Sequence, residues 1–316
     1  MLVLGADEIR RLAPPRRVVE ALREVFARGG VVAVRTPSPV PGDSPNRLFV
    51  SMLAMDEVGG PVIKLITIYP ENPAQGLVTV QGAIVVFSET GAPTAILDGT
   101  IVTQLRTGAA SALASDYLSR QDSRHLVIMG TGALAPSMAA AHCAVRPIER
   151  ISVWGRSADK AAATVAAISQ QVPGVEVAVT DRIEESVANA DIVSCSTSSP
   201  TPILHGKWLR PGTHVDLVGA FQPTKRESDD EVVLRARIFV DTMHGAMNEA
   251  GDLLEPMSRG IIDKSRIEGQ LEDLASGRMK GRRSNDEITL FKSSGTAIED
   301  LAMARMVVEA AGAPSD

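Results

Sequence analysis

The chain has 316 residues, of which 44% are hydrophobic and only 3% aromatic, and its formal net charge at pH 7 is −6. This length exceeds that of an average single domain and suits two domains, each with its own core. A negative charge without a sustained basic stripe argues against nucleic acid as a partner. The two cysteines are too few for a disulfide framework.

The N-terminal residues and the lengths of the apolar runs indicate where in the cell the protein is expected. Residues 1–8 contain no basic region followed by a long apolar run. No segment reaches the roughly 20 consecutive apolar residues that a membrane-spanning helix requires. We therefore expect a cytoplasmic protein that binds neither a membrane nor nucleic acid, and we assign no metal ligands.

The first 115 residues predict a helix followed by short strands. Residues 10–29 distribute apolar side chains among charged ones, as in a helix that covers a core. Five strand-like runs follow, separated by turns rich in Pro and Gly. Such strands predict an antiparallel or mixed sheet, and hence an α+β domain. The runs are residues 31–34, 48–53, 62–68, 78–87 and 93–97.

Three basic residues in this region stand out because their neighbours are apolar. Arg35 ends the first strand-like run, Lys64 lies inside an apolar strand, and Arg106 is expected near the start of an Ala-rich helix. Each has an ordinary explanation, since an inward lysine can pair with a buried acid and arginines are common at strand ends. Together they predict a carboxylate-binding pocket, because a guanidinium binds a planar carboxylate through two hydrogen bonds.

A glycine turn between a strand and a helix predicts a dinucleotide site. Residues 125–129 form a short apolar strand, and residues 136–144 favour a helix. In a Gly-x-Gly-x-x-Ala turn the first glycine bends the chain, the second lets the backbone approach the pyrophosphate, and the small third residue permits close packing. The free N–H groups of the helix N-terminus then face the anion. The expected cofactor contacts here are Gly130, Thr131, Gly132, Ala133 and Leu134.

The end of the next strand, residues 151–155, indicates which dinucleotide binds. An NAD site usually carries Asp or Glu there, about 20 residues beyond the turn, to hold the ribose 2′-hydroxyl. This chain has Gly155-Arg156-Ser157 instead, with Lys160 one turn later. These groups would bind a 2′-phosphate, although Arg156 and Lys160 also fit ordinary solvated charges. We therefore expect NADPH as the cofactor, with NADH binding more weakly.

Strands and helices continue to alternate through the middle of the chain. Strands are predicted at residues 175–180, 191–197, 214–219 and 236–241, with a helix at 183–190 and a last helix at 296–311. This alternation predicts an α/β doubly wound parallel sheet, which binds ligands at the carboxyl ends of its strands. Thr197, Ser198 and Val218 therefore become cofactor candidates, although the Thr and Ser residues also suit a plain turn.

Several segments together resemble the ornithine cyclodeaminase/mu-crystallin family, over essentially the whole chain. The resemblance implies a Rossmann domain, residues 116–292, inserted into an α+β substrate-binding and dimerisation domain of residues 1–115 and 293–316. It therefore also implies a homodimer. The segments that carry the resemblance are GAPTAILDG (91–99), TQLRTGAA (103–110), the turn at 130–133, VWGRS (153–157) and ITLFKSSGTAIEDL (288–301).

The resemblance also implies roles for individual residues. The counterparts of Arg35, Lys64 and Arg106 bind the carboxylate of the substrate in this family. Arg106 and Thr107 are further expected to reach the cofactor. Ser294 and Gly295 are expected to close over its nicotinamide ring.

Phe221 marks a departure from the cyclodeaminases. Those enzymes carry an Asp at this point, soon after the strand that ends near Gly219, and it serves the substrate amino group and the attacking water. Phe can neither take nor give a proton, so cyclodeamination is disfavoured. The pattern around Phe221 resembles the ketimine reductase branch, which reduces cyclic imino acids such as Δ1-pyrroline-2-carboxylate and Δ1-piperideine-2-carboxylate to L-proline and L-pipecolate.

The expected mechanism is hydride transfer from NADPH to a protonated cyclic C=N bond. Arg35 and Arg106 would hold the carboxylate, and Phe221 would contact the unsubstituted ring. Lys64, the expected catalytic residue, would add a carboxylate contact or manage the proton near the imine nitrogen. Two alternatives remain: an ornithine cyclodeaminase or amino-acid dehydrogenase on this scaffold, and a non-catalytic NADPH-binding protein. The sequence leaves the ring size open.

Overall fold

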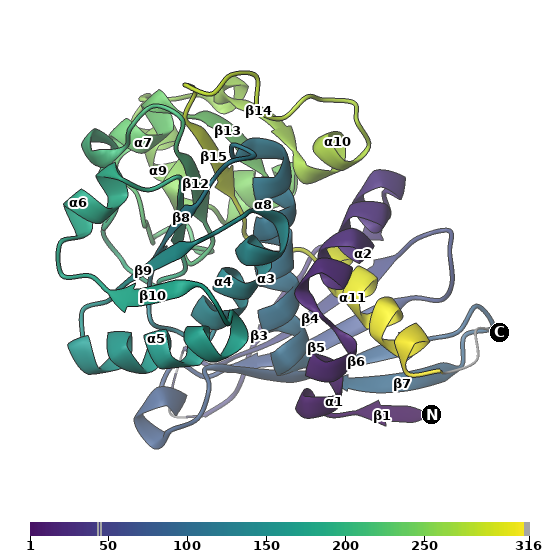
Figure 1. Cartoon of the computed structure of the whole chain (residues 1–316). Helices are drawn as coiled ribbons and strands as arrows, with labels where there is room; N and C mark the ends of the chain where they lie inside the picture. Colours follow the sequence, from purple (N-terminus) through teal and green to yellow (C-terminus); the bar gives the residue numbers. More distant parts are fainter. Residues whose placement is uncertain (43, 45, 313–316) are drawn as a thin grey trace. The chain divides into compact units, whose positions relative to one another are not determined.

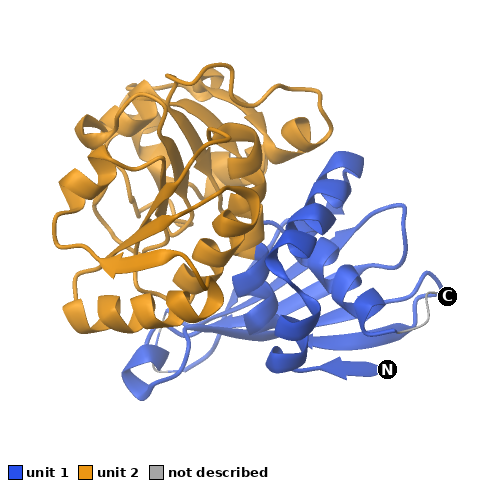
Figure 2. Ribbon diagram, in the orientation of Figure 1, with its two compact units in different colours: residues 1–106, 296–316 blue, residues 107–295 orange. Residues whose placement is uncertain are grey.

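The computed structural model describes residues 1–42, 44 and 46–312. The chain divides into two compact units, which are coloured separately in Figure 2: unit 1 is Met1–Arg106 with Thr296–Asp316, and unit 2 is Thr107–Gly295. The boundaries fall at 106/107 and 295/296 rather than at the expected 115/116 and 292/293. The first boundary lies inside one uninterrupted helix, α3 (Gly99–Leu118), so no change of composition marks it.

Unit 1 is built on a mixed seven-stranded sheet in the order β1-β7-β6-β5-β4-β2, with β3 also paired to β4. All neighbours are antiparallel except β1 and β7, which are parallel. The mixed sheet expected from the short strands is therefore confirmed. The strands are β1 (Leu2–Leu4), β2 (Val31–Val32), β3 (Thr36–Pro39), β4 (Leu48–Met55), β5 (Val62–Ile68), β6 (Val80–Phe87) and β7 (Pro93–Asp98).

Helices α2 (Pro15–Arg28) and α11 (Ala297–Ala310) lie against each other, and α11 packs on β4, β5 and β6 (Figure 1). The single helix expected over residues 10–29 is wrong, because α1 (Ala6–Leu12) ends before Pro14 and α2 begins at Pro15. Proline disfavours helical backbone in the residue before it and is well tolerated at a helix start. A 3-10 turn at Asn72–Gln75 completes the unit.

Unit 2 contains an eight-stranded sheet in the order β10-β9-β8-β11-β12-β15-β13-β14, and every neighbouring pair is parallel. The first five strands follow the doubly wound order of dinucleotide-binding sheets. The expected fold class is thus confirmed. The strands are β8 (His125–Met129), β9 (Arg150–Trp154), β10 (Glu176–Val179), β11 (Ile192–Cys195), β12 (His214–Leu217), β13 (Arg237–Val240), β14 (Ile267–Gln270) and β15 (Thr289–Lys292).

Helices of unit 2 alternate with these strands, as the sequence predicts. Apolar strand residues such as Val127 and Ile128 are fully buried, in cores on the two faces of the sheet. Among the described residues, no helix is long and apolar enough to cross a membrane. The helices after α3 are α4 (Ala135–Val145), α5 (Ala158–Gln171), α6 (Ile183–Ala188), α7 (Asp230–Arg235), α8 (Met243–Asn248), α9 (Gly251–Ser258) and α10 (Leu271–Ala275).

Candidate active site

Lys64 and Arg106 lie together in unit 1, in a cluster of four buried charged side chains. Lys64 on β5 is only 1% exposed, and its Nζ is 2.6 Å from Asp300 Oδ2 on α11. Arg106 on α3 donates from Nε to Asp300 Oδ1 at 3.2 Å and from Nη1 to Glu299 Oε2 at 2.5 Å. We call Lys64, Arg106, Glu299 and Asp300 the buried ion cluster. Two of its four members, Glu299 and Asp300, were not singled out from the sequence.

Burial controls the charge of Lys64. Removal from water lowers the pKa of its ammonium group from 10.5 to about 8, against the opposing attraction of Asp300, and the Arg106 charge lowers it further. A buried ammonium is costly unless an acid pairs with it, which explains the close contact with Asp300. A lysine with this pKa can hold or release a proton close to neutral pH.

Arg106 reaches the cluster from the middle of its helix. The expected position near the helix start is wrong, because α3 already begins at Gly99. Asp98 Oδ1 accepts hydrogen bonds from Thr100 N at 2.8 Å and Ile101 N at 3.1 Å, and so caps the helix two turns before Arg106.

Arg35 is half-buried in the connection between β2 and β3. The next residue, Thr36, pairs with Ser51 of β4, and the following β4 residue, Met52, pairs with Lys64 of β5. Arg35 directly precedes β3, and only β4 separates β3 from β5, the strand that carries Lys64. The part of Arg35 in a carboxylate pocket stays a prediction.

In unit 2, the predicted glycine turn connects β8 to α4 at the carboxyl edge of the sheet. Gly130 has φ +131°, a conformation that favours glycine, and its N–H donates to Trp154 O at 2.9 Å. A Cβ at Gly130 would lie 3.0 Å from Ser196 O, whereas a Cβ at Gly132 would meet no atom within 4 Å. Gly132 thus faces open space at a helix N-terminus, which fits the close approach of a pyrophosphate.

The end of β9 packs against this turn. A Cβ at Gly155 would lie 2.4 Å from Thr131 Cγ2, so a larger residue there would force the Thr131 side chain to move. Ser157 caps α5 by accepting from Lys160 N at 3.4 Å. Arg156 and Lys160 are exposed, as a contact with a 2′-phosphate would require, but their role stays a prediction.

The turns after β11 and β12 are joined by Glu227, a fully buried residue that the sequence analysis did not select as a site residue. Its Oε1 accepts from Thr197 N at 2.6 Å and from Thr197 Oγ1 at 3.0 Å. Its Oε2 accepts from Gly219 N at 2.7 Å and from Ala220 N at 3.2 Å. Thr197 thus lies at the predicted rim of strand ends. Its partner Thr197 lies 30 residues away, so the local sequence does not show that Glu227 joins the two turns.

The remaining candidates lie along the same chain segments. Val218 is buried in a core cluster against which Leu134 also packs, Ser198 is exposed, and Phe221 is half-buried directly after Ala220. Thr107, in α3, is the first residue of unit 2 and is 5% exposed. Their roles in binding stay predictions.

Asp241, which follows β13, fixes the Ser294–Gly295 loop. Its Oδ2 accepts from Ser294 N at 2.7 Å, from Gly295 N at 2.6 Å and from Ser293 Oγ at 3.0 Å. Gly295 has φ +80°, which favours glycine. One carboxylate oxygen therefore sets the conformation of the loop that is predicted to cover the nicotinamide.

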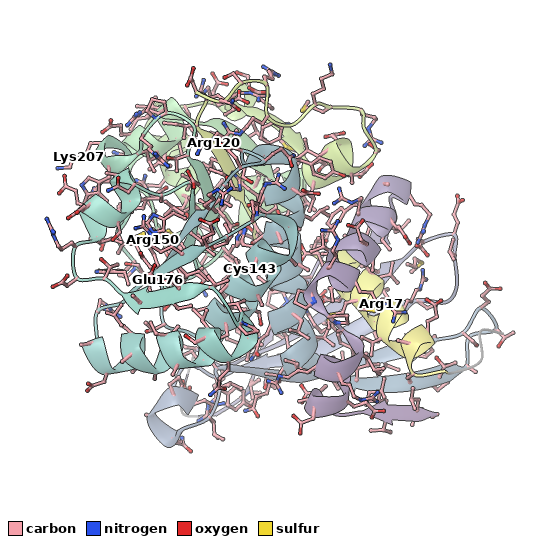
Figure 3. The ribbon with its side chains drawn as sticks, viewed as in Figure 1. Arg17, Arg120, Cys143, Arg150, Glu176 and Lys207 are labelled. Carbon is pink, nitrogen blue, oxygen red and sulfur yellow. The ribbon has the colours of Figure 1, made fainter. Side chains whose placement is uncertain are left out.

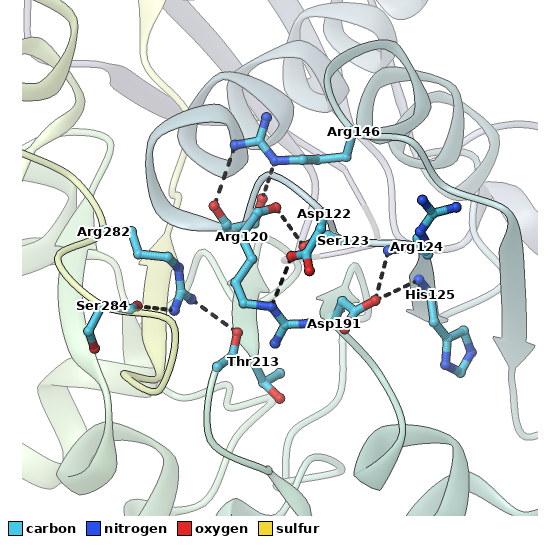
Figure 4. A network of polar contacts seen from close by, with 12 residues as sticks. Arg120, Asp122, Ser123, Arg124, His125, Arg146, Asp191, Thr213, Arg282 and Ser284 are labelled. Carbon is cyan, nitrogen blue, oxygen red and sulfur yellow. Dashed lines mark hydrogen bonds and ion pairs between the residues drawn. The ribbon is translucent and has the colours of Figure 1, made fainter.

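A network of polar contacts in unit 2 lies at the opposite, amino edge of the sheet (Figure 4). Asp191, directly before β11, accepts from Arg124 N at 2.7 Å and His125 N at 3.0 Å, and it pairs with Arg120 and Arg210. Arg150 and Glu176 begin the neighbouring strands β9 and β10 at this edge (Figure 3). Ligands of such sheets bind at the carboxyl edge, so this network stabilises the fold.

The fold and these two groups of residues define a class of protein, in which one chain contains both a parallel sheet of the dinucleotide-binding type and an α+β unit with buried cations. The sequence matches the model of the ornithine cyclodeaminase/mu-crystallin family over residues 15–314. The chain belongs to this family, as the sequence motifs indicated.

Comparison with individual proteins gives three similar relatives. A Δ1-pyrroline-2-carboxylate reductase of Colwellia psychrerythraea is 38% identical over 314 residues, covering 98% of this chain and 99% of that one. The Thermococcus litoralis Δ1-pyrroline-2-carboxylate reductase, solved with NADH and L-proline, superposes with a TM-score of 0.93 at 34% identity, over 98% and 97% of the chains. An archaeal alanine dehydrogenase dimer with bound NAD gives 0.89 at 29% identity, over 98% and 96%.

Proposed function

We propose that this protein reduces Δ1-pyrroline-2-carboxylate, Δ1-piperideine-2-carboxylate or both to L-proline and L-pipecolate, with NADPH as the preferred hydride donor. It is then an NAD(P)H-dependent oxidoreductase that acts on C=N bonds. The two reductases among its relatives support this function, and one of them binds NADH and L-proline. Phe221 supports it further, because a residue without an acidic group disfavours deamination.

The observation that carries the proposal is the buried ion cluster. Lys64 and Arg106 are cations held in place by Asp300 and Glu299, with side chains at most 8% exposed. Together with Arg35, they are the groups to which we assign the substrate carboxylate. Arg106 provides a planar fork of donors, and fixing the carboxylate orients the imine carbon for attack.

Reduction of the imine also requires a proton on the ring nitrogen. The nicotinamide supplies the hydride when it is bound. Lys64, with its pKa lowered to about 8 mainly by burial, either adds a contact to the carboxylate or holds the proton near that nitrogen. Phe221 contacts the unsubstituted carbon atoms of the ring.

The cofactor is assigned to the carboxyl edge of unit 2. Residues Gly130 to Leu134 bind the pyrophosphate, and Arg156, Ser157 and Lys160 bind the 2′-phosphate that distinguishes NADPH from NADH. Ser294 and Gly295 cover the nicotinamide, and Arg106 and Thr107 reach the cofactor. The remaining assigned contacts are Gly155, Thr197, Ser198 and Val218.

We further propose a homodimer formed through the face of the unit 1 sheet opposite Lys64. On β5, Val62, Lys64 and Ile66 are buried, while Ile63 and Leu65 on the other face are only half-buried. Phe49 on β4 is 40% exposed. Exposed and half-buried apolar side chains gathered on one sheet face mark an interaction surface, and an archaeal relative is a dimer. We also propose a cytoplasmic location, where reduced cofactor is regenerated.

The decisive assay follows oxidation of NADPH and of NADH with each of the two cyclic imines, and incubates L-ornithine with NAD in parallel. We expect rapid NADPH oxidation with an imine, slower NADH oxidation, and no ammonia from ornithine. Ammonia release would favour a cyclodeaminase, and cofactor binding without turnover would favour a binding protein. Equal rates with both cofactors would contradict the role of Arg156 and Lys160.

Substitution of Lys64 tests the catalytic assignment. Lys64→Met keeps the apolar stem but removes the charge and the proton, so we expect turnover to fall by roughly 100-fold or more. NADPH binding, measured by fluorescence titration, should be unchanged. Turnover close to that of the wild type would remove Lys64 from the mechanism.

A further inference from the structure

Glu227 is a buried carboxylate whose position the proposed reaction does not explain. It lies between β12 and α7, is fully buried, and accepts four hydrogen bonds from the turns after β11 and β12. A buried charge is costly, and the cost is offset only where several donors converge on it. Three of the four donors here are backbone N–H groups, so the carboxylate fixes the path of the chain itself.

The backbones of the turn after β11 and the turn after β12 are in direct contact. A Cβ at Gly219 would lie 1.8 Å from Thr197 O and 2.2 Å from Thr197 N. The turn after β11 and the turn after β12 therefore fit together only because Gly219 has no side chain. Both turns lie at the carboxyl edge of the sheet, where ligands bind.

Glu227 is itself held by further buried groups. Asp252 Oδ1 accepts from Glu227 N at 2.8 Å and from Ser228 N at 2.9 Å, and its Oδ2 is 3.3 Å from Lys292 Nζ. Lys292 Nζ also donates to Leu217 O at 3.3 Å, at the last residue of β12. The Glu227 backbone is thus held by Asp252 of α9, which pairs with Lys292 of β15, while the two carboxylate oxygens each hold one turn.

We propose that Glu227 is a positioning residue that fixes the Thr197 turn of the cofactor site and the Gly219–Ala220 turn that presents Phe221. This inference rests on the proposed function and adds a link between cofactor binding and substrate binding. Each carboxylate oxygen serves one turn, so a change at Glu227 affects both ligands at once. Glu227 touches neither ligand and acts through Thr197 and Phe221.

The test is the isosteric variant Glu227→Gln. Its amide offers one acceptor oxygen and one NH2 group, so one turn loses its acceptor and faces a donor. Hydrogen bonds to charged groups are among the stronger ones, and we expect NADPH binding to weaken roughly 10-fold or more. The KM for the imine should rise along with it, by more than kcat falls.

Asp191→Asn is the matched control. Asp191 also accepts from two backbone N–H groups and pairs with arginines, but it does so at the amino edge. Both variants should lower the melting temperature, and only Glu227→Gln should change the Kd for NADPH and the KM. If Glu227→Gln lowers the melting temperature but leaves Kd and KM at wild-type values, Glu227 is merely structural and the proposal is wrong.

A measurement on the wild type covers the case in which the variant does not fold. Burial raises the pKa of Glu227 to about 7, against the opposing attraction of Lys292, while the charge of Asp252 raises it further. The Glu227 charge also acts on Cys195, the last residue of β11.

Protonation removes an acceptor, so the Kd for NADH should rise as the pH falls through about 7. NADH is the probe because it lacks the 2′-phosphate, which titrates near pH 6. A Kd independent of pH would overturn the proposal. Failure of the wild type to bind either cofactor would instead refute the proposed function.

Discussion

At the scale of single residues, the chemistry of this protein depends on charges kept out of water. Lys64, Arg106 and Glu227 are each at most 6% exposed. Acids of α11 hold Lys64 and Arg106, and the turns after β11 and β12 hold Glu227. The two cations were predicted because their sequence surroundings are apolar. Asp300 and Glu227 were not, because acids within helical or loop sequences give no sign of what they contact.

Asp300 should control the pH dependence of the reaction. Burial lowers the pKa of Lys64 and the Asp300 charge raises it, with a result of about 8. If protonated Lys64 is required, kcat/KM falls as the pH rises through about 8. Asp300→Asn removes the charge that favours the ammonium form, so the fall should move to lower pH by roughly one unit.

The control for this prediction is Asp56→Asn, another buried acid of unit 1, which pairs with Arg28 and Arg305 outside the buried ion cluster. It should leave the pH profile of kcat/KM in place. A profile of Asp300→Asn that overlays the wild-type curve would show that Lys64 does not set the alkaline limb.

At the scale of elements, the turns at the carboxyl edge of unit 2 differ in packing: the turn at Gly219 is in close contact with the turn at Thr197, whereas the turn at Gly132 faces open space. Strand positions were largely predictable there, because each strand is a short apolar run followed by a turn. Strands β14 and β15 were missed, because polar residues accompany their few apolar ones: β14 reads IEGQ and β15 reads TLFK. The break between α1 and α2 was also missed, although Pro14 and Pro15 mark it in the sequence.

Two glycines of this edge should respond differently to alanine. Gly132→Ala adds a methyl group where no atom lies within 4 Å, so stability should be unchanged while NADPH binding weakens about 10-fold or more. Gly219→Ala places a Cβ 1.8 Å from Thr197 O, so we expect a loss of roughly 3 kcal/mol or more in unfolding free energy. Urea denaturation and fluorescence titration measure the two effects. Unaltered NADPH binding by Gly132→Ala would place the pyrophosphate elsewhere.

At the scale of the whole molecule, the chain passes from unit 1 to unit 2 inside α3 and returns at Gly295. The returning segment supplies α11, which carries Glu299 and Asp300 to the sheet of unit 1. The buried ion cluster therefore requires both ends of the chain. Helix α11 also covers the face of the unit 1 sheet that carries Lys64, and the opposite face is the one to which we assign the proposed homodimer contact.

A charge on that other face should disrupt the proposed homodimer. Leu65→Asp places a carboxylate on a half-buried apolar strand, opposite the face that carries Lys64. We expect the mass in solution to fall from twice 33.4 kDa to that of one chain. Light scattering after size-exclusion chromatography measures it. Leu234→Asp, at a 51% exposed leucine of unit 2, is the control and should stay dimeric. A monomeric wild type would contradict the proposal.

The sequence by itself determined the parallel sheet, the glycine turn and the family, because short segments of neighbouring residues indicate each of them. In the same way it indicated Arg35, Lys64 and Arg106 as candidates for a carboxylate-binding pocket. Tertiary structure alone decided that Asp300 pairs with Lys64 and that Glu227 joins the turns after β11 and β12. It also decided that β15 lies between β12 and β13. The reason is physical: a buried charge needs a partner wherever the fold brings one, and strand register and helix packing choose that partner from distant parts of the chain.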